Sequence, residues 1–584
     1  MEDQKLETTL NLALDTGEAE RARSLNLNTG FEEDTRSWEL IVKYNGSLEA
    51  VKELDPGIRV TPLMNGFAIL LVPEALVEKT AALPEIEFVE KPKRLSFAMY
   101  AGRAASCMEA VQTAPFSLTG RDVLVGIADS GIDYTLADFR NEDGSTRILR
   151  LWDQTALGKE DNSGYGYGHV YTEAEINEAL TAGSRERQRE LVPEADTSGH
   201  GTAVAGIAAG NGRGAGDQAE LSRGIAWESD LLIVKLGTPR PNSFPRTTQL
   251  MAAVDFLVRE AIGTGRPLAL NLSFGNSYGS HDGTSLLDVY LDAMAMSGRF
   301  SFAAGSGNEG AMRGHARLFL EKKPGGFAEV LLAVGEYEPS LNIQIWKSFL
   351  DTFELRLVAP TGQEVPVTPL MQPGRARFGS TNVLIYYGEP GPFSRGQEIY
   401  LDFISESGRV IGGLWRLRFY PRDIRDGQVD LWLPGGGVLN ANTGFLVPDP
   451  NTTLTIPSTA SGVITVAAYD AARQVYADFS GRGFLRSGEK DKPDLAAPGV
   501  GIRTTAVGGG YTEVTGTSFA TPFVAGSAAL MMEWGIVRGN DPYLYGEKVK
   551  AYLQRGARPL PGLTVYPNPQ VGWGTLCLKE SLPV

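Results

Sequence analysis

Four histidines limit where acid–base chemistry near neutral pH can take place in this chain of 584 residues. His200 lies in the segment DTSGHGTAVAGIAAG, where the small residues after it are typical of a closely packed helix. Asp129 ends the apolar run VLVGIAD, and Ser518 stands near the start of the helical segment GTSFATPFVAGSAAL. Either of these two alone would be interpreted as a helix cap. An acid, a base and a hydroxyl in this chain order instead indicate nucleophilic catalysis by an activated serine.

The elements that would position these residues are continuous apolar runs of strand length. VLVGIAD, LLIVKLG, LALNLSFG and FSFAAGSG are separated by glycine-containing turns and helical stretches, and SGVITVAAYD follows much later. Such runs are typical of a parallel sheet buried on both faces. We therefore predict an α/β fold with helices on both faces of a parallel sheet. Asp129 would then lie at the carboxyl edge of the sheet, where ligands bind in such folds.

Three segments carry a family resemblance. IADSGID, SGHGTAVAG and GTSFATPFVAG resemble the three signatures of the subtilisin-like serine proteases, whose triad has the same Asp–His–Ser order. Four lesser matches, IVKLG, NLSFG, AAGSGNEG and AAPGV, follow in the family's order. The resemblance covers about residues 121–310 and 456–560.

The resemblance implies a role for each matching residue. Asp129 would be the triad acid, His200 the base, Ser518 the nucleophile and Asn308 the oxyanion-hole amide. The remaining matches would bind substrate. Ser273 and Gly275 would belong to the strand that pairs with the substrate backbone. The primary side-chain pocket would be lined by Gly305, Ser306 and Gly307. The resemblance implies no cofactor, and we predict no required metal because no calcium loop of the EF-hand type is present.

Two positions depart from the family pattern. Ala203 and Phe523 stand where the family usually has a second and a third histidine. Neither is a triad position, so we expect altered packing and retained catalysis. The spacing from Asp129 to His200 is about twice that of compact subtilisins, and it includes YTEAEINEAL. That segment opens with a Thr-x-x-Glu capping box and predicts a surface helix.

The N-terminal region divides into a polar arm, residues 1–36, and a small α/β module, residues 37–100. The module is predicted to follow a β-α-β-α-β order, and it resembles the inhibitory prodomain of subtilisins. The resemblance implies self-cleavage with the tail left in the active-site cleft as a product. We expect the cut near Tyr100–Ala101, because KRLSFAMY is free to run extended and small residues follow it. A cut elsewhere in the linker, such as after Met99 or near Cys107, is the alternative.

The rest of the chain divides into a first part of the protease core, residues 101–314, an insertion, residues 315–455, and a second part of the core, residues 456–584. Within the insertion LNIQIW, FELRLV, IYLDF, WRLRF and VDLWL alternate apolar and polar residues, and helix signals are almost absent. This pattern predicts an antiparallel β-sandwich or jelly roll.

A prodomain, a polar arm and a β insertion before the serine segment resemble the clostridial Csp germination proteases. This narrower resemblance implies that the protein activates a cortex-lytic zymogen by limited proteolysis and is incorporated into the spore. Two other interpretations stay open: a degradative intracellular subtilisin, and a non-catalytic signalling scaffold whose cleft is plugged by the prodomain. The partners expected are the chain's own prodomain and a protein substrate, and the chain is expected to be a monomer.

Composition excludes other classes. The net charge of −16 argues against binding nucleic acid or an anionic membrane surface. The N-terminus has no basic region followed by an apolar one, so we expect synthesis in the cytoplasm without a signal peptide. No run approaches the length of a membrane span. For the two cysteines, Cys107 and Cys577, we expect free buried thiols, with a bridge between them as the alternative.

Overall fold

The structure is a computed structural model that describes residues 2–24, 26–93, 105–238, 245–321, 326–368, 374–488 and 491–583. The chain divides into two compact units. The sandwich unit consists of Met1–Arg94, Asn276–Leu286 and Ala311–Ile456, and the α/β unit consists of Leu95–Gly275, Leu287–Gly310 and Pro457–Val584. The predicted prodomain and the predicted insertion, far apart in sequence, therefore belong to one unit.

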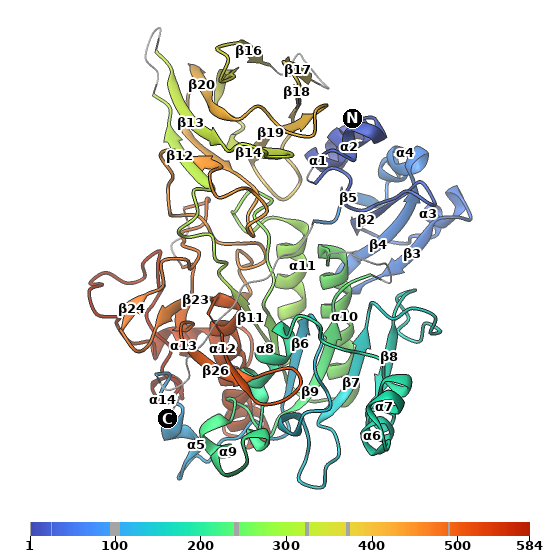
Figure 1. Ribbon diagram of the computed structural model, residues 1–584, viewed down its shortest axis with the longest axis vertical. Coiled ribbons are helices and arrows are strands. Elements are labelled where there is room, and N and C mark those ends of the chain that lie inside the picture. The colour runs from blue at the N-terminus through green and yellow to red at the C-terminus, as the bar shows by residue number, and fades with distance from the viewer. Residues whose placement is uncertain are drawn as a thin grey trace. The chain divides into compact units, whose positions relative to one another are not determined.

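The α/β unit is built on a nine-stranded sheet, in the order β24-β23-β11-β10-β6-β9-β7-β8 with β25 paired to β23. The predicted apolar runs form its central strands, which pair in parallel, so the predicted fold class is confirmed. Only the outer pairs β7–β8 and β23–β24 are antiparallel in the described part of this sheet. The strands are β6 (Leu124–Asp129), β7 (Ile148–Asp153), β8 (His169–Thr172), β9 (Asp230–Lys235), β10 (Leu268–Leu272), β11 (Phe300–Gly305), β23 (Val463–Asp470), β24 (Val475–Tyr476) and β25 (Leu495–Pro498) (Figure 1).

Two helices of this unit carry candidate residues and are buried along their whole length. Both α8 (His200–Ala209) and α12 (Thr517–Met532) are rich in Ala and Gly, which lets backbones approach closely. A Cβ on Gly206 would meet the Thr504 hydroxyl oxygen at 2.6 Å, so a larger residue there would push away the segment that carries Thr504. The continuous helix from Thr517 to Val537 is long and apolar enough to span a membrane. However, 83% of its most apolar 18-residue window is buried inside the protein.

The other helices of the unit lie over the sheet or at its edges (Figure 1). The expected surface helix is present as α6, and its capping box is complete, with Thr172 and Glu175 exchanging hydrogen bonds. These elements are α5 (Glu109–Gln112), α6 (Glu173–Thr181), α7 (Arg185–Leu191), α9 (Ala219–Ser222), α10 (Thr247–Thr264), α11 (Leu286–Ala295), α13 (Glu547–Arg555), α14 (Leu578–Ser581) and the hairpin β26 (Ile502–Thr505) with β27 (Tyr511–Val514).

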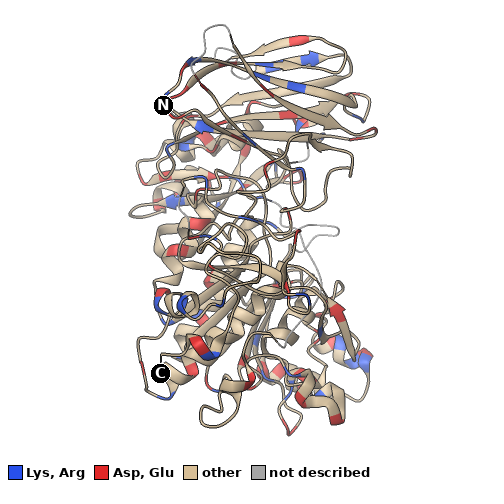
Figure 2. Cartoon of the chain, turned by 90° about the vertical axis from the view of Figure 1, so that its left-hand side faces the viewer, with Lys and Arg blue, Asp and Glu red and all other residues tan. Residues whose placement is uncertain are grey.

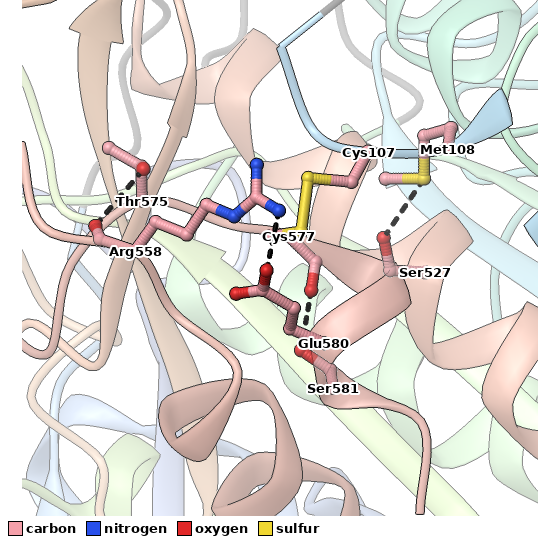
Figure 3. The surroundings of a disulfide bond; sticks show 8 residues. All are labelled: Cys107, Met108, Ser527, Arg558, Thr575, Cys577, Glu580 and Ser581. Carbon is pink, nitrogen blue, oxygen red and sulfur yellow. Dashed lines mark hydrogen bonds and ion pairs between the residues drawn. A yellow bond between two sulfur atoms is a disulfide. The ribbon is translucent and has the colours of Figure 1, made fainter. Parts of the chain in front are cut away.

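The expectation of two free thiols is wrong. Cys107 and Cys577 form a disulfide, with Cα atoms 4.9 Å apart and a separation of 470 positions in the sequence (Figure 3). Met108 beside it accepts a hydrogen bond from the Ser527 hydroxyl of α12 through its sulfur at 3.8 Å. The bridge therefore joins the beginning of the protease core to its last helix.

The insertion consists of two antiparallel sheets that enclose one hydrophobic core. One sheet has the order β12-β21-β14-β19-β18-β17, and the other has the order β16-β15-β20-β13-β22. All five alternating segments form strands, as predicted. The strands are β12 (His315–Phe319), β13 (Ala328–Val334), β14 (Leu341–Ser348), β15 (Thr352–Val358), β16 (Glu364–Val367), β17 (Gly374–Phe378), β18 (Thr381–Tyr387), β19 (Gly396–Ser405), β20 (Gly413–Asp423), β21 (Gln428–Trp432) and β22 (Gly444–Phe445).

Charged side chains of opposite sign alternate across the outer face of the second sheet. Arg418 lies 2.8 Å from both Glu329 and Glu364, and Arg356 contacts Glu354 and Glu364 at 2.6 and 3.0 Å. Figure 2 shows basic and acidic residues interspersed on these strands. These ion pairs keep the exposed face of this sheet polar, with a net charge close to zero.

The prodomain region is a five-stranded sheet in which β5 joins the path β1-β2-β4-β3 by pairing with β2. The three predicted strands and two helices are present, but β1 and β3 escaped prediction because each is too short to show a period. The elements are β1 (Phe31–Glu32), β2 (Ser37–Tyr44), α3 (Glu49–Leu54), β3 (Arg59–Pro62), β4 (Phe67–Pro73), α4 (Val77–Ala82) and β5 (Ile86–Glu90), preceded by α1 (Thr8–Leu14) and α2 (Glu18–Arg21).

The N-terminal arm is part of a hydrophobic core and does not project as a polar extension. Leu10 and Leu12 of α1 are at most 1% exposed. They belong to one cluster with prodomain residues such as Trp38 and with Tyr400 and Leu384 of the insertion. The sequence predicts a polar arm because its apolar residues are few. Those few residues are nevertheless buried, in a core shared with the prodomain sheet and with a sheet of the insertion.

Candidate active site

Asp129 and His200 form the centre of the candidate site. Asp129 is the last residue of β6, and His200 is the first residue of α8. The His200 Nδ1 lies 2.6 Å from the Asp129 Oδ1, and both side chains are at most 2% exposed. The backbone N–H of Ser130 donates to the same oxygen at 2.7 Å. The carboxylate thus fixes the proton on Nδ1 and leaves Nε2 as the nitrogen for proton transfer.

Ser518 lies beside this pair. Its hydroxyl donates to the Ser273 carbonyl at 3.2 Å, and the Ser273 hydroxyl donates back to the Ser518 carbonyl at 2.8 Å. The next residue, Phe519, has its ring centroid 5.1 Å from that of His200. Ser518 is thus the sequence neighbour of a residue whose ring contacts that of His200, and its hydroxyl is turned towards the Ser273 carbonyl, just after the end of β10.

Asn308 follows β11 and faces the start of α12. Its Oδ1 accepts hydrogen bonds from the backbone N–H and the hydroxyl of Thr517, at 3.1 and 3.3 Å. This contact fixes the orientation of the amide and directs its NH₂ group away from Thr517. Thr517 is the neighbour of Ser518, so the amide group is held against the turn that carries the hydroxyl.

The residues expected to bind substrate lie around the same turn. Gly305 ends β11, and a Cβ there would lie 3.0 and 3.1 Å from the hydroxyl oxygens of Thr521 and Thr517. Ser306 is fully buried, with its hydroxyl oxygen 3.1 Å from that of Ser480, so its side chain faces the interior. Of the other expected residues, Gly275 and Gly307 are partly accessible. Ser273 is buried and contacts Ser518 through the hydrogen bonds described above. The expected cut site, Tyr100 and Ala101, lies outside the described residues.

Comparisons with known proteins match this geometry. The model of the subtilase family matches residues 120–383 and 442–574, and that of the Csp protease B prodomain matches residues 4–93. The chain belongs to the subtilase family. The solved structure of the CspB protease of Clostridium perfringens is similar at 34% identity with a TM-score of 0.74, covering 82% of this chain and 95% of that one.

Curated relatives of this subtilase are much longer proteins. The PIII-type proteinase of Lactococcus lactis subsp. cremoris is 26% identical over 477 residues, which are 74% of this chain and 23% of the relative. The C5a peptidase of Streptococcus pyogenes serotype M18 is 23% identical over 446 residues, which are 71% of this chain and 35% of the relative. The chain thus spans about a quarter to a third of the length of these relatives.

Sequence reasoning missed Asp196, which holds the start of the subtilase's histidine helix. Its Oδ1 accepts from the Ser130 hydroxyl at 2.8 Å and from the Gly199 N–H at 2.9 Å. Its Oδ2 accepts from both the N–H and the hydroxyl of Thr202, each at 2.8 Å. This buried carboxylate therefore ties the loop after Asp129 to the turn before His200. The available signal was an Asp four residues before the histidine, at the distance of a helix cap.

A second buried carboxyl, Glu194, lies against the same loop. Burial raises the pKa of Glu194 well above its ordinary value, and Lys235, with its Nζ 3.7 Å from Oε1, offsets only part of this effect. The Ile132 N–H donates to Glu194 at 3.3 Å. The carboxyl fills the space beside Gly131 and supports the backbone that follows the triad aspartate.

The two departures from the subtilase pattern lie in the hydrophobic core. Ala203 and Phe523 are at most 2% exposed and belong to the same apolar cluster. Two further histidines, His281 and His315, both stack on the Trp432 ring in the sandwich unit, with centroid distances of 4.3 and 4.7 Å. Burial lowers the pKa of His281 to about 4, so it is neutral at physiological pH.

No group of three or more His, Cys, Asp or Glu side chains in the described ranges has an arrangement that could hold a metal ion.

Proposed function

We propose that this subtilase is a serine endopeptidase that cleaves its own prodomain and then one protein substrate by limited proteolysis. The observation that carries the proposal is the buried Asp129–His200 hydrogen bond with Ser518 on the neighbouring turn. An isolated serine is a weak nucleophile, and this arrangement supplies the base that activates it.

The geometry gives each residue one task in the reaction. The Ser518 hydroxyl rotates from the Ser273 carbonyl towards His200, whose Nε2 takes its proton as the oxygen attacks the peptide carbonyl. Asp129 stabilises the imidazolium that forms. His200 then gives the proton to the leaving amine, and water hydrolyses the acyl-enzyme by the same route. A catalytic hydrogen bond that forms only when substrate is bound is common in free enzymes.

The oxyanion would be stabilised by two donors on the α12 side of the site. The Asn308 NH₂ group and the Ser518 backbone N–H are both adjacent to Thr517, which holds the Asn308 oxygen. The positive end of α12 adds to their effect, because this helix is 16 residues long and starts at Thr517. Such preorganised donors act on the charge that develops in the transition state.

Replacement of the nucleophile tests the proposal. Ser518→Ala should leave one chain of 62.9 kDa, whereas the unchanged protein should separate into two fragments by intact-mass measurement. Ser527→Ala is the matched control, since its hydroxyl lies in the same helix and contacts the Phe523 carbonyl at 2.7 Å and the Met108 sulfur at 3.8 Å, and none of the candidate catalytic residues. A fluorophosphonate should label the unchanged protein and the control but not Ser518→Ala. Two fragments from Ser518→Ala, in the absence of other proteases, would exclude Ser518 as the nucleophile.

We further propose that the prodomain stays attached after cleavage, through the insertion. Leu10 of the arm and Tyr400 of the insertion share a core with the prodomain sheet, and Arg375 of the insertion lies 2.7 Å from Glu20. These contacts lie within the sandwich unit and do not depend on the cut peptide bond. The two fragments should therefore elute together in size-exclusion chromatography. Tyr400→Ala should separate them, since it removes a large buried ring, and exposed Leu157→Ala should not.

The substrate that we propose is a cortex-lytic zymogen activated during spore germination, with the protease incorporated into the spore. The similarity to the CspB protease and the Csp prodomain match support this role. The processed enzyme should cut a purified zymogen at one site and leave casein largely intact. Rapid hydrolysis of casein at many sites would favour a degradative enzyme instead. Absence of fluorophosphonate labelling even after the prodomain is removed would favour a scaffold.

A further inference from the structure

A cavity of about 280 Å³ lies in the sandwich unit, and none of its wall residues belongs to the triad. Its wall is formed by the arm at residues 4–11 and by the end of the prodomain strand β5. The insertion contributes strands β14, β18 and β19 and the loop that connects β18 to β19. Residues 279–285 complete it. The proteolytic mechanism uses none of these residues. The volume is close to that of small-molecule sites.

Carboxylates outnumber cations in the wall. Glu7, Glu90 and Glu398 line the cavity together with one ammonium group, that of Lys93. The Lys93 Nζ lies 3.1 Å from the Glu7 Oε1 and is also paired with Glu90. Glu90 and Lys93 are at most 5% exposed, and so is Glu398. Glu90 also accepts from the Leu286 N–H at 3.2 Å. When these four groups are ionised, they carry two negative charges in excess, and Glu389, an exposed residue of the wall, adds a third.

Aromatic rings form the other part of the wall. Phe88 and Phe393 meet edge to face with centroids 6.3 Å apart, and they join the prodomain to the insertion. Trp346 also lines the cavity, and its buried indole N–H has no hydrogen-bond partner among the described residues. Rings of this kind attract organic cations through the negative charge of their faces.

We infer that this cavity binds a small organic ammonium ion that carries an apolar group. The excess of carboxylates selects a positive charge, and the rings accommodate the apolar part. A metal ion does not fit the donors, because no metal-binding group of three acidic, Cys or His side chains occurs in the described part of the chain. The ligand would contact the arm, the prodomain and the insertion together. Occupancy would therefore strengthen the attachment of the prodomain, by mass action on the folded unit.

The charge on Glu398 couples binding to pH. Burial, and after it the charges of Glu7 and Glu90, raise the pKa of Glu398 to about 8, although Lys93 and the Thr8 hydroxyl act in the opposite direction. An ammonium ligand favours the ionised carboxylate, so binding releases a proton from Glu398. Affinity should therefore rise between about pH 6 and pH 8, the range over which this carboxyl begins to ionise.

The test uses the full-length Ser518→Ala protein, so its result is independent of proteolysis. 2-Phenylethylamine, 2-phenylethanol and phenylacetate are compared as cationic, neutral and anionic probes by calorimetry and by the shift of the melting temperature. The amine should bind and raise the melting temperature, more so at about pH 8 than at about pH 6, and the other two should not. No stabilisation by the amine at millimolar concentration, or equal stabilisation by all three probes, would overturn the inference.

Substitutions locate the binding. Glu398→Gln should weaken amine binding by about tenfold or more, because it removes one charged partner. Asp402→Asn is the matched control, since Asp402 is a fully buried carboxyl of the same strand that is not part of the cavity wall. Phe393→Leu, at a half-buried wall position, is the second test if Glu398→Gln does not fold. Unchanged affinity in both Glu398→Gln and Phe393→Leu would place the amine elsewhere.

Discussion

Asp402 offers a quantitative test of how the insertion holds the arm. It lies on β19 between Tyr400 and Ile404, which both pack against the arm and the prodomain, and it is fully buried. Burial raises the pKa of Asp402 from 3.8 to about 7, whereas the Ser24 hydroxyl and the Lys91 ammonium lower it only in part. Asp402 is therefore largely protonated in the folded protein below neutral pH.

The sign and size of the pH effect follow from this shift. Between about pH 4 and pH 7 the folded chain keeps a proton that the unfolded chain has released, so the free energy of unfolding falls as pH rises. Each pKa unit corresponds to about 1.36 kcal/mol. From pH 5 to pH 8 the window covers about two units, so Asp402 should remove about 3 kcal/mol of stability.

Urea unfolding at pH 5 and pH 8, in the Ser518→Ala background, measures this difference. The parent should lose about 3 kcal/mol more than Asp402→Asn on going from pH 5 to pH 8, because asparagine does not titrate. Glu53→Gln, an exposed position of the prodomain, should behave like the parent. Equal pH dependence in the parent and in Asp402→Asn would refute a buried, protonated Asp402 and the packing of the arm against β19.

Four further outcomes are expected. Asn308→Ala should lower the kcat of the processed enzyme by about 10²–10³ with little change in KM, because its amide acts in the transition state. Asp196→Ala should lower kcat by distorting the His200 turn, and Asp196→Asn, which keeps part of the hydrogen bonding, should recover some of the loss in peptide-hydrolysis assays. Removing the disulfide by Cys107→Ser should cost about 2–4 kcal/mol of stability, measured by urea unfolding with and without reductant. N-terminal sequencing of the large fragment should begin near Ala101, and a start before Lys91 or after Gln112 would contradict the proposed cut.

Local sequence was sufficient for the sheet of the protease core and for the elements that carry Asp129 and His200. A strand buried on both faces needs an unbroken apolar run, so VLVGIAD could be placed in a parallel sheet and Asp129 at its carboxyl edge. The helix starting at His200 and the capping box at Thr172 also depend on residues within one turn. The alternating strands of the insertion were equally evident, since a period of two is a property of each strand alone.

Other features depended on which surfaces meet in the folded chain. The Cys107–Cys577 bridge spans 470 residues, and no local pattern records such a pairing. Asp196 acquires its role only when the loop at Ser130 comes within hydrogen-bond distance. The arm has too few apolar residues to show a core by itself, and Leu10 becomes buried because the prodomain and the insertion enclose it. Periodicity and capping depend on a few neighbouring residues, so they can be predicted from the sequence. Contacts between distant segments form only when the chain folds, so no local pattern predicts them.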